Sequence, residues 1–267
     1  MTPEPIAAPD SSTPPTGSRG VALVTGGGVR LGRAVSLRLA EEGFDLVVSW
    51  RSSEEPARSL QEEVAALGRR CTLVQADLAD PEGADTVVDA ARDAYGRLDL
   101  LVNSAAGFDT TPLLGVDAEL WDHIMAVNTR APHLTVRAAA DLLGTVGGSV
   151  VNITDLSAFQ AWTQYPVHAV SKAALAHLTR VQARALAPEV RVNAIAPGAV
   201  LPPDDHDEGA WEALVERTPL RSLGTPEDVA RTVLFLVDSP YVTGQVIAVD
   251  GGRLLGPSGP PTGDEAG

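Results

Sequence analysis

Three residues with acid–base side chains stand close together in the second half of the sequence. His168 follows Asp155 by 13 residues, and Lys172 follows His168 by four. An imidazole has an ordinary pKa of about 6.5, which suits the transfer of a proton near neutral pH. The positive charge of Lys172 opposes protonation of the ring, but Asp155 can offset this effect by pairing with it. Side chains of these three types could together transfer a proton near neutral pH.

A turn rich in glycine near the beginning of the chain predicts a phosphate-binding site. The apolar run 21–24 leads into the segment TGGGVRLG at 25–32, and helical spacing follows it. Glycines allow the backbone to approach a pyrophosphate closely, and the N–H groups at the start of a helix attract the anion. Its position between a first strand and a first helix favours this interpretation over a plain glycine-rich turn, which is the alternative.

The end of the second predicted strand indicates which dinucleotide is bound. A site for NAD usually has an acidic residue here, which binds the ribose 2′-hydroxyl. The segment SWRSS at 49–53 contains no acid, and Glu54 is the first one to follow. Arg30 and Arg51 can instead bind a 2′-phosphate, with help from the hydroxyl of Ser52 or its neighbour. NADP(H) is therefore the favoured cofactor, and two solvated surface arginines are the alternative.

Strands that alternate with helices must position these residues. Short apolar segments predict strands at 21–24, 45–50, 71–75, 98–103, 148–153, 190–194 and 245–249. Amphipathic segments predict helices at 33–42, 54–67, 81–95, 117–143, 168–186 and 226–237. Strands joined by helices form right-handed crossovers, so the predicted fold class is α/β. We expect a Rossmann-like, doubly wound parallel sheet of about seven strands with helices on both faces.

A single NADP-binding domain is expected over residues 20–255. Residues 1–19 contain five prolines together with Ser and Thr, which predicts a disordered leader. Residues 256–267 have a similar composition and predict a flexible tail.

Charge and composition narrow the classes of partner to small molecules. The formal net charge of -15 opposes binding to nucleic acid and to anionic membrane surfaces. No apolar run reaches the roughly 18 residues of a membrane span. The single cysteine, Cys71, excludes a disulfide within the chain, and a cytoplasmic location is the simple expectation. The other histidines lack the spacing of metal ligands, so no metal site is expected.

Several short motifs occur in order along the chain. They are TGGGVRLG at 25–32, ADL at 76–78, NSAAG at 103–107, VN at 127–128, SK at 171–172, VRVNAIAPG at 190–198 and YVTGQVIAVDGG at 241–252. With this set the chain resembles the short-chain dehydrogenase/reductase family over residues 20–255. It is most similar to the pteridine-reductase branch, which carries a basic residue at the place of Arg30. That branch also has an aspartate at the place of Asp155, where most relatives have a serine.

The resemblance implies a set of residues around the cofactor. Asp77 would contact the adenine, and Lys172 would hold the nicotinamide ribose. Asn128 would help to hold a water molecule near Lys172. The alternatives are a turn or cap role for Asp77 and bonding to the helix backbone for Asn128. The full implied set is Gly26, Arg30, Leu31, Arg51, Ser52, Asp77, Leu78, Asn103, Ala105, Lys172, Pro197, Gly198 and Val200.

The sequence departs from the family at the position of the catalytic acid. In the family this acid is a tyrosine four residues before the active-site lysine, and His168 stands at that position here. The resemblance therefore implies an HxxxK active site made of His168, Lys172, Asp155 and Asn128. Two alternatives stay open. Either Tyr165 or Asp155 supplies the proton, or the chain has lost its redox activity.

The substrate is expected to contact loops that follow the strands, among them the loop 201–220. The candidates are Phe108, Asp155, Trp162 and Tyr165, and the three aromatic rings among them can stack on a flat ring. We therefore predict NADPH-dependent hydride transfer to a C=N or C=O bond of a small, planar heterocycle.

The alternative function is a repurposed fold that binds NADP(H) but performs non-redox chemistry, as a cyclase or dehydratase does, or a regulatory role. The resemblance also implies a homotetramer or homodimer, built through the helices near 117–144 and 168–187.

Overall fold

The chain, seen in a computed structural model, folds around one parallel sheet. The structure describes residues 17–202 and 208–256, and within them the sheet has seven strands in the order β3-β2-β1-β4-β5-β6-β7. The strands are β1 (Gly20–Thr25), β2 (Phe44–Trp50), β3 (Cys71–Gln75), β4 (Leu100–Asn103), β5 (Ser149–Ile153), β6 (Arg191–Pro197) and β7 (Val246–Val249). The neighbouring strands pair in parallel, which confirms the predicted doubly wound sheet.

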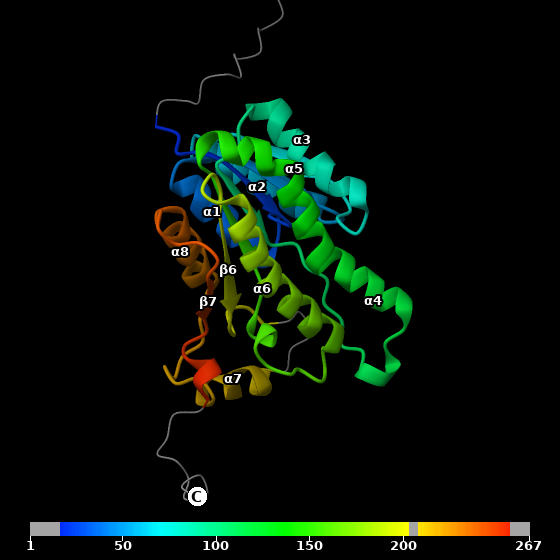
Figure 1. Ribbon diagram of the computed structural model, residues 1–267. Coiled ribbons are helices and arrows are strands. Elements are labelled where there is room, and N and C mark those ends of the chain that lie inside the picture. Colours follow the sequence, from blue (N-terminus) through cyan, green and yellow to red (C-terminus); the bar gives the residue numbers. More distant parts are fainter. Residues whose placement is uncertain (1–16, 203–207, 257–267) are drawn as a thin grey trace, which may run out of the picture.

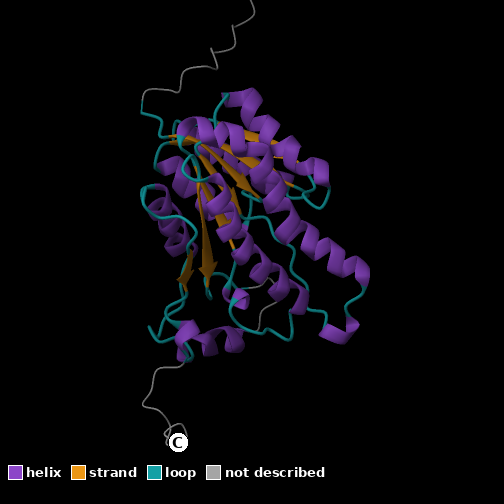
Figure 2. Ribbon diagram, viewed as in Figure 1, coloured by secondary structure: helices purple, strands orange, loops and turns teal. Residues whose placement is uncertain are grey.

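Helices cover both faces of this sheet (Figures 1 and 2). One face carries α1 (Arg30–Glu41), α2 (Glu54–Ala66) and α8 (Pro226–Val237). The other carries α3 (Pro81–Tyr95), α5 (Ala131–Val146) and α6 (Pro166–Leu186). Two further helices, α4 (Ala118–Met125) and α7 (Glu208–Glu216), lie beyond the sheet in Figure 1, as do the short turns η1 (Leu113–Gly115) and η4 (Arg253–Leu255).

Small aliphatic side chains fill the core on both faces. Every residue of β1, β4 and β5 is buried. This is typical of parallel strands that helices cover on both sides, and it explains the Val and Leu residues at the middle of these strands. Phe44 and Tyr95 are among the few aromatic residues in the core. The low aromatic content therefore did not prevent a close-packed sheet.

The carboxyl ends of the central strands meet at one edge of the sheet. Thr25 of β1 lies opposite Asn103 of β4, and Asn103 lies opposite Asn152 of β5. The strand order reverses between β1 and β4 at this point. In open α/β sheets, ligands bind in the crevice outside such a reversal. The sheet therefore directs the segments after β1, β4 and β5 toward one place.

Two helical segments differ from the prediction. The predicted helix over 117–143 is two helices, α4 and α5, joined by a π-helical turn, η2 (Ala126–Arg130). Such turns are frequent at functional sites, and apolar periodicity alone does not reveal the extra residue. The predicted loop 201–220 contains α7, a helix of nine residues. So short a helix offers little periodicity, and so the sequence pattern did not indicate it.

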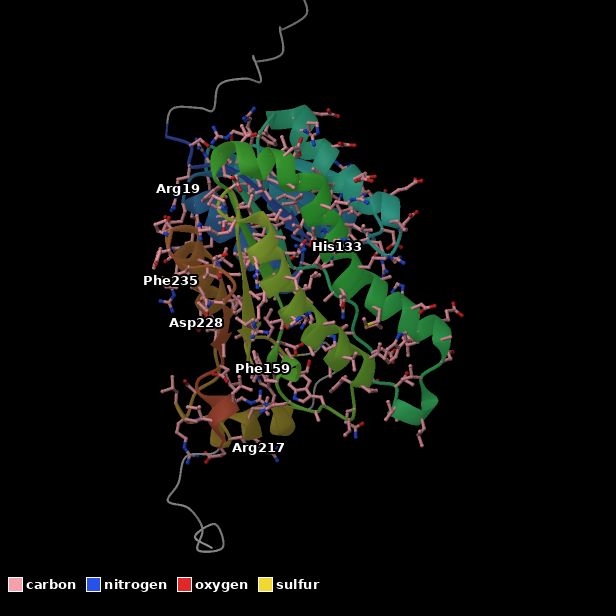
Figure 3. The ribbon with its side chains drawn as sticks, in the orientation of Figure 1. Arg19, His133, Phe159, Arg217, Asp228 and Phe235 are labelled. Atoms are coloured by element: carbon pink, nitrogen blue, oxygen red, sulfur yellow. The ribbon has the colours of Figure 1, made fainter. Side chains whose placement is uncertain are left out.

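The predicted leader 1–19 and tail 256–267 lie mostly outside the described residues. The described part of the leader includes Arg19, which is labelled in Figure 3. Its backbone N–H donates to the Gly43 carbonyl at 2.9 Å, and its guanidinium contacts Asp238. Across the described residues, no helix has both the length and the apolar character that a membrane crossing requires.

Candidate active site

The glycine-rich turn between β1 and α1 is tightly folded. Gly26 has a φ of 63°, and a Cβ on it would lie 3.1 Å from the Cα of Ala105. A Cβ on Gly32 would lie only 2.3 Å from the carbonyl oxygen of Gly26. Val29 is the N-cap of α1, and no side chain caps the first N–H groups of the helix there. Bare backbone and a helix start without a side-chain cap fit a pyrophosphate group.

The two arginines of the predicted phosphate site lie in different surroundings. Arg30 is exposed at the start of α1, with a φ of 50°, and its Nη2 donates to the carbonyl of Pro202 at 2.7 Å. Arg51 and Ser52 follow β2 directly, and both are exposed. Leu31 is partly buried against the core beneath α1. Arg30 would have to release Pro202 in order to bind a phosphate with the same nitrogen.

Asp77 and Leu78 follow β3. Asp77 is exposed, and its Oδ1 accepts the N–H of Ala79 at 2.9 Å, which makes it a turn residue. The cap of α3 is Asp80, whose side chain accepts the N–H of Glu82. Leu78 is buried and packs in the core. Asp77 therefore has the turn role that the sequence allowed as an alternative to contact with adenine.

Hydrogen bonds tie the end of β4 to both neighbouring strands. The hydroxyl of Thr25 accepts the N–H groups of Ser104 and Ala105 at 3.0 and 3.1 Å. Asn103 donates to the side chain of Asn152 at 2.8 Å, and both are buried. The loop after β4 is thus fixed at its base.

Pro197, Gly198 and Val200 lie where β6 ends. The N–H of Gly198 donates to the Val249 carbonyl at 2.9 Å, and a Cβ on Gly198 would lie 2.7 Å from the Cα of Asp250. Pro197 is buried, whereas Val200 is partly buried and packs against the core. The backbone therefore passes closely beside β7 before it enters the predicted substrate loop.

Lys172 is buried on α6, and its Nζ donates to the carbonyl of Ile153 at 2.8 Å. Burial lowers the pKa of Lys172, and the charge of Asp155 opposes that shift. The ammonium group therefore lies at the carboxyl end of β5, near the carboxylate of Asp155.

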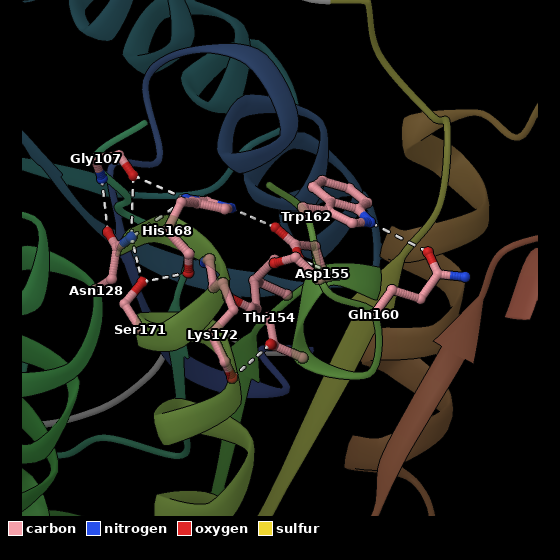
Figure 4. A network of polar contacts seen from close by, with 11 residues as sticks. Gly107, Asn128, Thr154, Asp155, Gln160, Trp162, His168, Ser171 and Lys172 are labelled. Carbon is pink, nitrogen blue, oxygen red and sulfur yellow. Dashed lines mark hydrogen bonds and ion pairs between the residues drawn. The ribbon is translucent and has the colours of Figure 1, made fainter. Parts of the chain in front are cut away.

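His168 and Asp155 form a direct pair (Figure 4). The Nε2 atom of His168 lies 2.5 Å from Oδ2 of Asp155, and Nδ1 lies 3.1 Å from the carbonyl oxygen of Gly107. Oδ1 of Asp155 accepts the N–H of Ser157 at 2.7 Å and also its hydroxyl, in the turn η3 (Leu156–Ala158). Burial would raise the pKa of Asp155, but the hydrogen bond from His168 and the charges of His168 and Lys172 hold it below its usual range.

Asn128 lies in the π-helical turn and contacts the same group. Its Nδ2 donates to the Gly107 carbonyl at 3.0 Å and to the hydroxyl of Ser171 at 2.9 Å. Its Oδ1 accepts the N–H of Gly107 at 2.7 Å. Nδ2 also lies 3.4 Å from Nδ1 of His168. Its strongest contacts are thus to the loop after β4 and to α6, rather than to Lys172.

Aromatic rings cover one side of the pair. The ring of Phe108 lies 4.5 Å from that of Tyr165 and 4.8 Å from that of His168, centroid to centroid. Tyr165 in turn lies 6.1 Å from the ring of Trp162. Phe108 is half-exposed, so the cluster reaches the surface. The structure thus brings together the three aromatic residues that the sequence suggested for the substrate.

Sequence reasoning missed Gly107 and Ser171 as parts of the site. Ser171 adjoins Lys172 in the motif at 171–172, and its hydroxyl donates to the carbonyl of His168 at 2.7 Å. A Cβ on Gly107 would lie 2.8 Å from Cδ1 of Ile124, so Gly107 packs closely against α4. Gly107 lies in the motif at 103–107 and Ser171 in the motif at 171–172. Their place in these motifs was the one feature of the sequence that pointed to a role in the site. In residues 17–202 and 208–256, no cluster of His, Cys, Asp or Glu is arranged to hold a metal ion.

Known proteins are similar to this chain in sequence and in structure. A family model described as enoyl-(acyl carrier protein) reductase matches residues 28–253. The short-chain dehydrogenase/reductase FrzI of Cladobotryum sp is 37% identical over 254 residues, which cover 90% of this chain and 98% of that protein.

Two solved structures with a bound dinucleotide are similar as well. FolM alternative dihydrofolate reductase 1 from Brucella canis, complexed with NADP, has a TM-score of 0.86 at 33% identity, and the match covers 92% of this chain and 98% of that one. A blue fluorescent protein from a metagenomic library, in complex with NADPH, has a TM-score of 0.82 at 35% identity, and the match covers 88% of this chain and 98% of that one.

Proposed function

Because the chain belongs to the short-chain dehydrogenase/reductase family of NAD(P)-dependent oxidoreductases, we propose that it uses NADPH to reduce a C=N or C=O bond in a small, planar heterocycle. The observation that carries this proposal is the contact between His168 and Asp155 beside the aromatic residues Phe108 and Tyr165. An acid–base pair next to stacked rings suits proton transfer to a flat substrate. The domain for this reaction is proposed to span residues 20–255.

The proposed cofactor is NADP(H). The close approach of Gly26 to Ala105 fits a pyrophosphate on the turn, and the exposed Arg51 and Ser52 can bind a 2′-phosphate together with Arg30. The similar structures with NADP and NADPH support the same choice. When bound, the nicotinamide supplies a hydride to the carbon of the substrate double bond. Residues at the ends of β3, β4 and β6 complete the proposed site, with Asp77, Leu78, Asn103, Pro197, Gly198 and Val200 among them.

His168, Asp155, Lys172 and Asn128 are the proposed catalytic group. His168 stands four residues before Lys172, at the position of the family's tyrosine, and the unit of His168 and Asp155 provides the proton. The buried ammonium of Lys172 is proposed to hold the nicotinamide ribose and to keep the Asp155 carboxylate charged. Asn128 positions the ring through the Gly107 carbonyl.

A pteridine-like ring is the proposed substrate class. Phe108 is half-exposed and tilted against Tyr165 at 31°, so a flat ring can insert beside it or replace this contact. Trp162 extends the aromatic surface. The similarity to a protein named as an alternative dihydrofolate reductase supports the same class.

NADPH oxidation with 7,8-dihydrobiopterin tests this function. We expect the absorbance of NADPH to fall when the full chain meets this compound, and to fall far more slowly with NADH. A dihydropterin that is not reduced, with NADPH bound tightly, would favour the non-redox alternative, because the site would then bind the cofactor without using it. An absence of NADPH binding in calorimetry would reject both. A cytoplasmic location and an assembly of two or four copies stay predictions from the sequence.

A further inference from the structure

The neighbours of Nδ1 of His168 indicate whether this ring nitrogen carries a proton. It faces the carbonyl oxygen of Gly107 at 3.1 Å, and a carbonyl oxygen can only accept a hydrogen bond. The amide of Asn128 is the other neighbour of Nδ1, at the longer distance of 3.4 Å. Nδ1 must therefore carry the proton itself unless Asn128 has a hydrogen left to donate to the ring.

Both hydrogens of the Asn128 amide are already used. The Gly107 N–H fixes the side-chain orientation, since it donates to Oδ1 at 2.7 Å. Nδ2 then donates to the Gly107 carbonyl and to the Ser171 hydroxyl at 3.0 and 2.9 Å. The Ser171 hydroxyl can accept, because its own hydrogen is donated to the carbonyl of His168. The proton between Nδ1 and Gly107 therefore belongs to His168.

A second proton lies between Nε2 of His168 and Oδ2 of Asp155. These two atoms are 2.5 Å apart, and two bare acceptors would repel each other at that distance. Oδ1 of Asp155 is occupied by two donors from Ser157. The pair therefore holds one proton more than a neutral histidine beside a carboxylate would hold.

Asp155 is the outer member of this pair. Its side chain is 19% exposed, whereas that of His168 is 5% exposed. Both ring nitrogens of His168 are engaged by protein atoms, and the ring of Phe108 packs against the imidazole at 79° (Figure 4 shows the polar contacts). A substrate at this surface would thus reach the carboxyl group before the imidazole.

We propose that Asp155 delivers the proton to the substrate, and that His168 is a positioning residue that keeps this proton on the pair. The proposal rests on the proposed reduction and assigns its acid.

The proton that a C=N or C=O substrate receives is the one shared by His168 and Asp155. While the substrate carbon receives hydride, the shared proton moves from Nε2 to Oδ2, and the carboxyl O–H turns toward the substrate. A new N–H or O–H bond forms as the O–H bond of Asp155 breaks. Asp155 is left as a carboxylate, and His168 is left neutral with its proton on Nδ1. The two electrons come from the nicotinamide, and solvent later returns a proton to the pair.

Among the residues that the structure describes, few charged groups act on the pair. Those that act on Asp155 are His168 and Lys172, both on α6. The other elements packed on the pair present uncharged groups, namely the Gly107 carbonyl and the side chains of Asn128, Ser157 and Ser171. The titratable Tyr165 contacts Phe108, whose ring also contacts the imidazole.

Nitrogen NMR of the full chain, labelled with ¹⁵N-histidine and free of cofactor, tests the shared proton. His168→Gln identifies the signal, and His177→Gln, at an exposed position of the same helix, is the matched control. We expect both ring nitrogens of His168 in the protonated range, with one ring proton shifted far downfield. Asp155→Asn should remove that downfield proton. A bare ring nitrogen on His168 in the unaltered protein would overturn the proposal.

The pH dependence of a single turnover with NADPH and 7,8-dihydrobiopterin tests which residue delivers the proton. Asp155→Asn should lose at least about a hundredfold in rate at every pH. His168→Gln should recover about tenfold for each pH unit lowered, because Asp155 alone must then be protonated by solvent. The assignment fails if Asp155→Asn keeps more than about a tenth of the rate, or if His168→Gln shows no recovery in acid.

The two proposals can fail separately. If the unaltered chain reduces no probe, the proposed function is rejected, while the NMR spectrum still decides whether the pair holds a shared proton. If the chain reduces the probe but the spectrum shows a bare nitrogen, the function stands and the role of Asp155 is rejected.

Discussion

Asn128 binds both backbone polar groups of Gly107, its N–H and its carbonyl oxygen. Its Oδ1 accepts the Gly107 N–H at 2.7 Å, and its Nδ2 donates to the Gly107 carbonyl at 3.0 Å. These two bonds attach the loop after β4 to the π-helical turn. The same carbonyl lies 3.1 Å from Nδ1 of His168, and Phe108 is the next residue in the chain. The backbone of Gly107 therefore positions the side chains of His168 and Phe108.

Replacing Asn128 should therefore destabilise the fold. We expect Asn128→Ala to lower the free energy of unfolding by about 1–3 kcal/mol, because it leaves buried polar groups without a partner. Asn128→Asp should cost more, because a buried carboxylate oxygen would then face the Gly107 carbonyl. Urea unfolding measures both. An aspartate variant as stable as the unaltered protein would show that this side chain does not face the carbonyl.

Replacing His168 should slow reduction at neutral pH. We expect His168→Ala to lose about 10²- to 10⁴-fold in the rate of NADPH oxidation, the usual contribution of a positioned acid–base group. Tyr165→Phe serves as the comparison, since it removes only the hydroxyl of the other candidate donor. Full activity in His168→Ala, together with a loss in Tyr165→Phe, would transfer the role to Tyr165.

Arg51 should decide the preference for NADPH. We expect Arg51→Ala to weaken NADPH binding by about ten- to a hundredfold and to leave NADH binding unchanged, because a charge-assisted hydrogen bond contributes about 1.5–3 kcal/mol. Arg58→Ala is the control, since Arg58 is also exposed and instead binds Glu54 on its own helix. Calorimetric titration gives both constants, and equal losses for the two cofactors would argue against a 2′-phosphate site here.

Arg191 should stabilise the end of α8. Its guanidinium donates to the carbonyls of Leu236, Val237 and Ser239 at 2.6, 2.9 and 3.0 Å. We expect Arg191→Met to lower the free energy of unfolding by about 2–3 kcal/mol, since bonds from a charged donor are lost. Arg180→Met should change it little, because Arg180 makes one long bond within α6. Equal unfolding curves for the two variants would contradict this role.

Cys71 should react slowly in the folded protein. Burial raises the pKa of its thiol to about 12, and only the thiolate attacks an alkylating reagent. Alkylation by iodoacetamide near neutral pH should be at least about a hundredfold slower than in urea, where the ordinary pKa is about 8.5. The folded-state rate should rise about tenfold per pH unit, because the thiolate fraction does. Similar rates in the folded and unfolded protein would contradict the raised pKa of this partly buried thiol.

Local patterns determined most of the fold. The run that became β1 is continuous and apolar at 21–24, because helices bury both faces of a parallel sheet. The glycines of the segment 25–32 predicted a tight turn. In the structure Gly26 has a positive φ, and Gly32 has no room for a side chain. The spacing of Asp155 and His168 likewise brought them into one site, where they are in contact.

Only the tertiary structure decided how His168 is used. Gly107 lies 61 residues before it and Asn128 lies 40 before it, yet both face the same ring nitrogen. Asn128 lies in the π-helical turn, which adds one residue to the helical path. A pattern of apolar residues does not reveal such a single added residue. The proton on each nitrogen of His168 then follows from which atoms face it, and those atoms come from chain segments that meet only when the sheet has assembled.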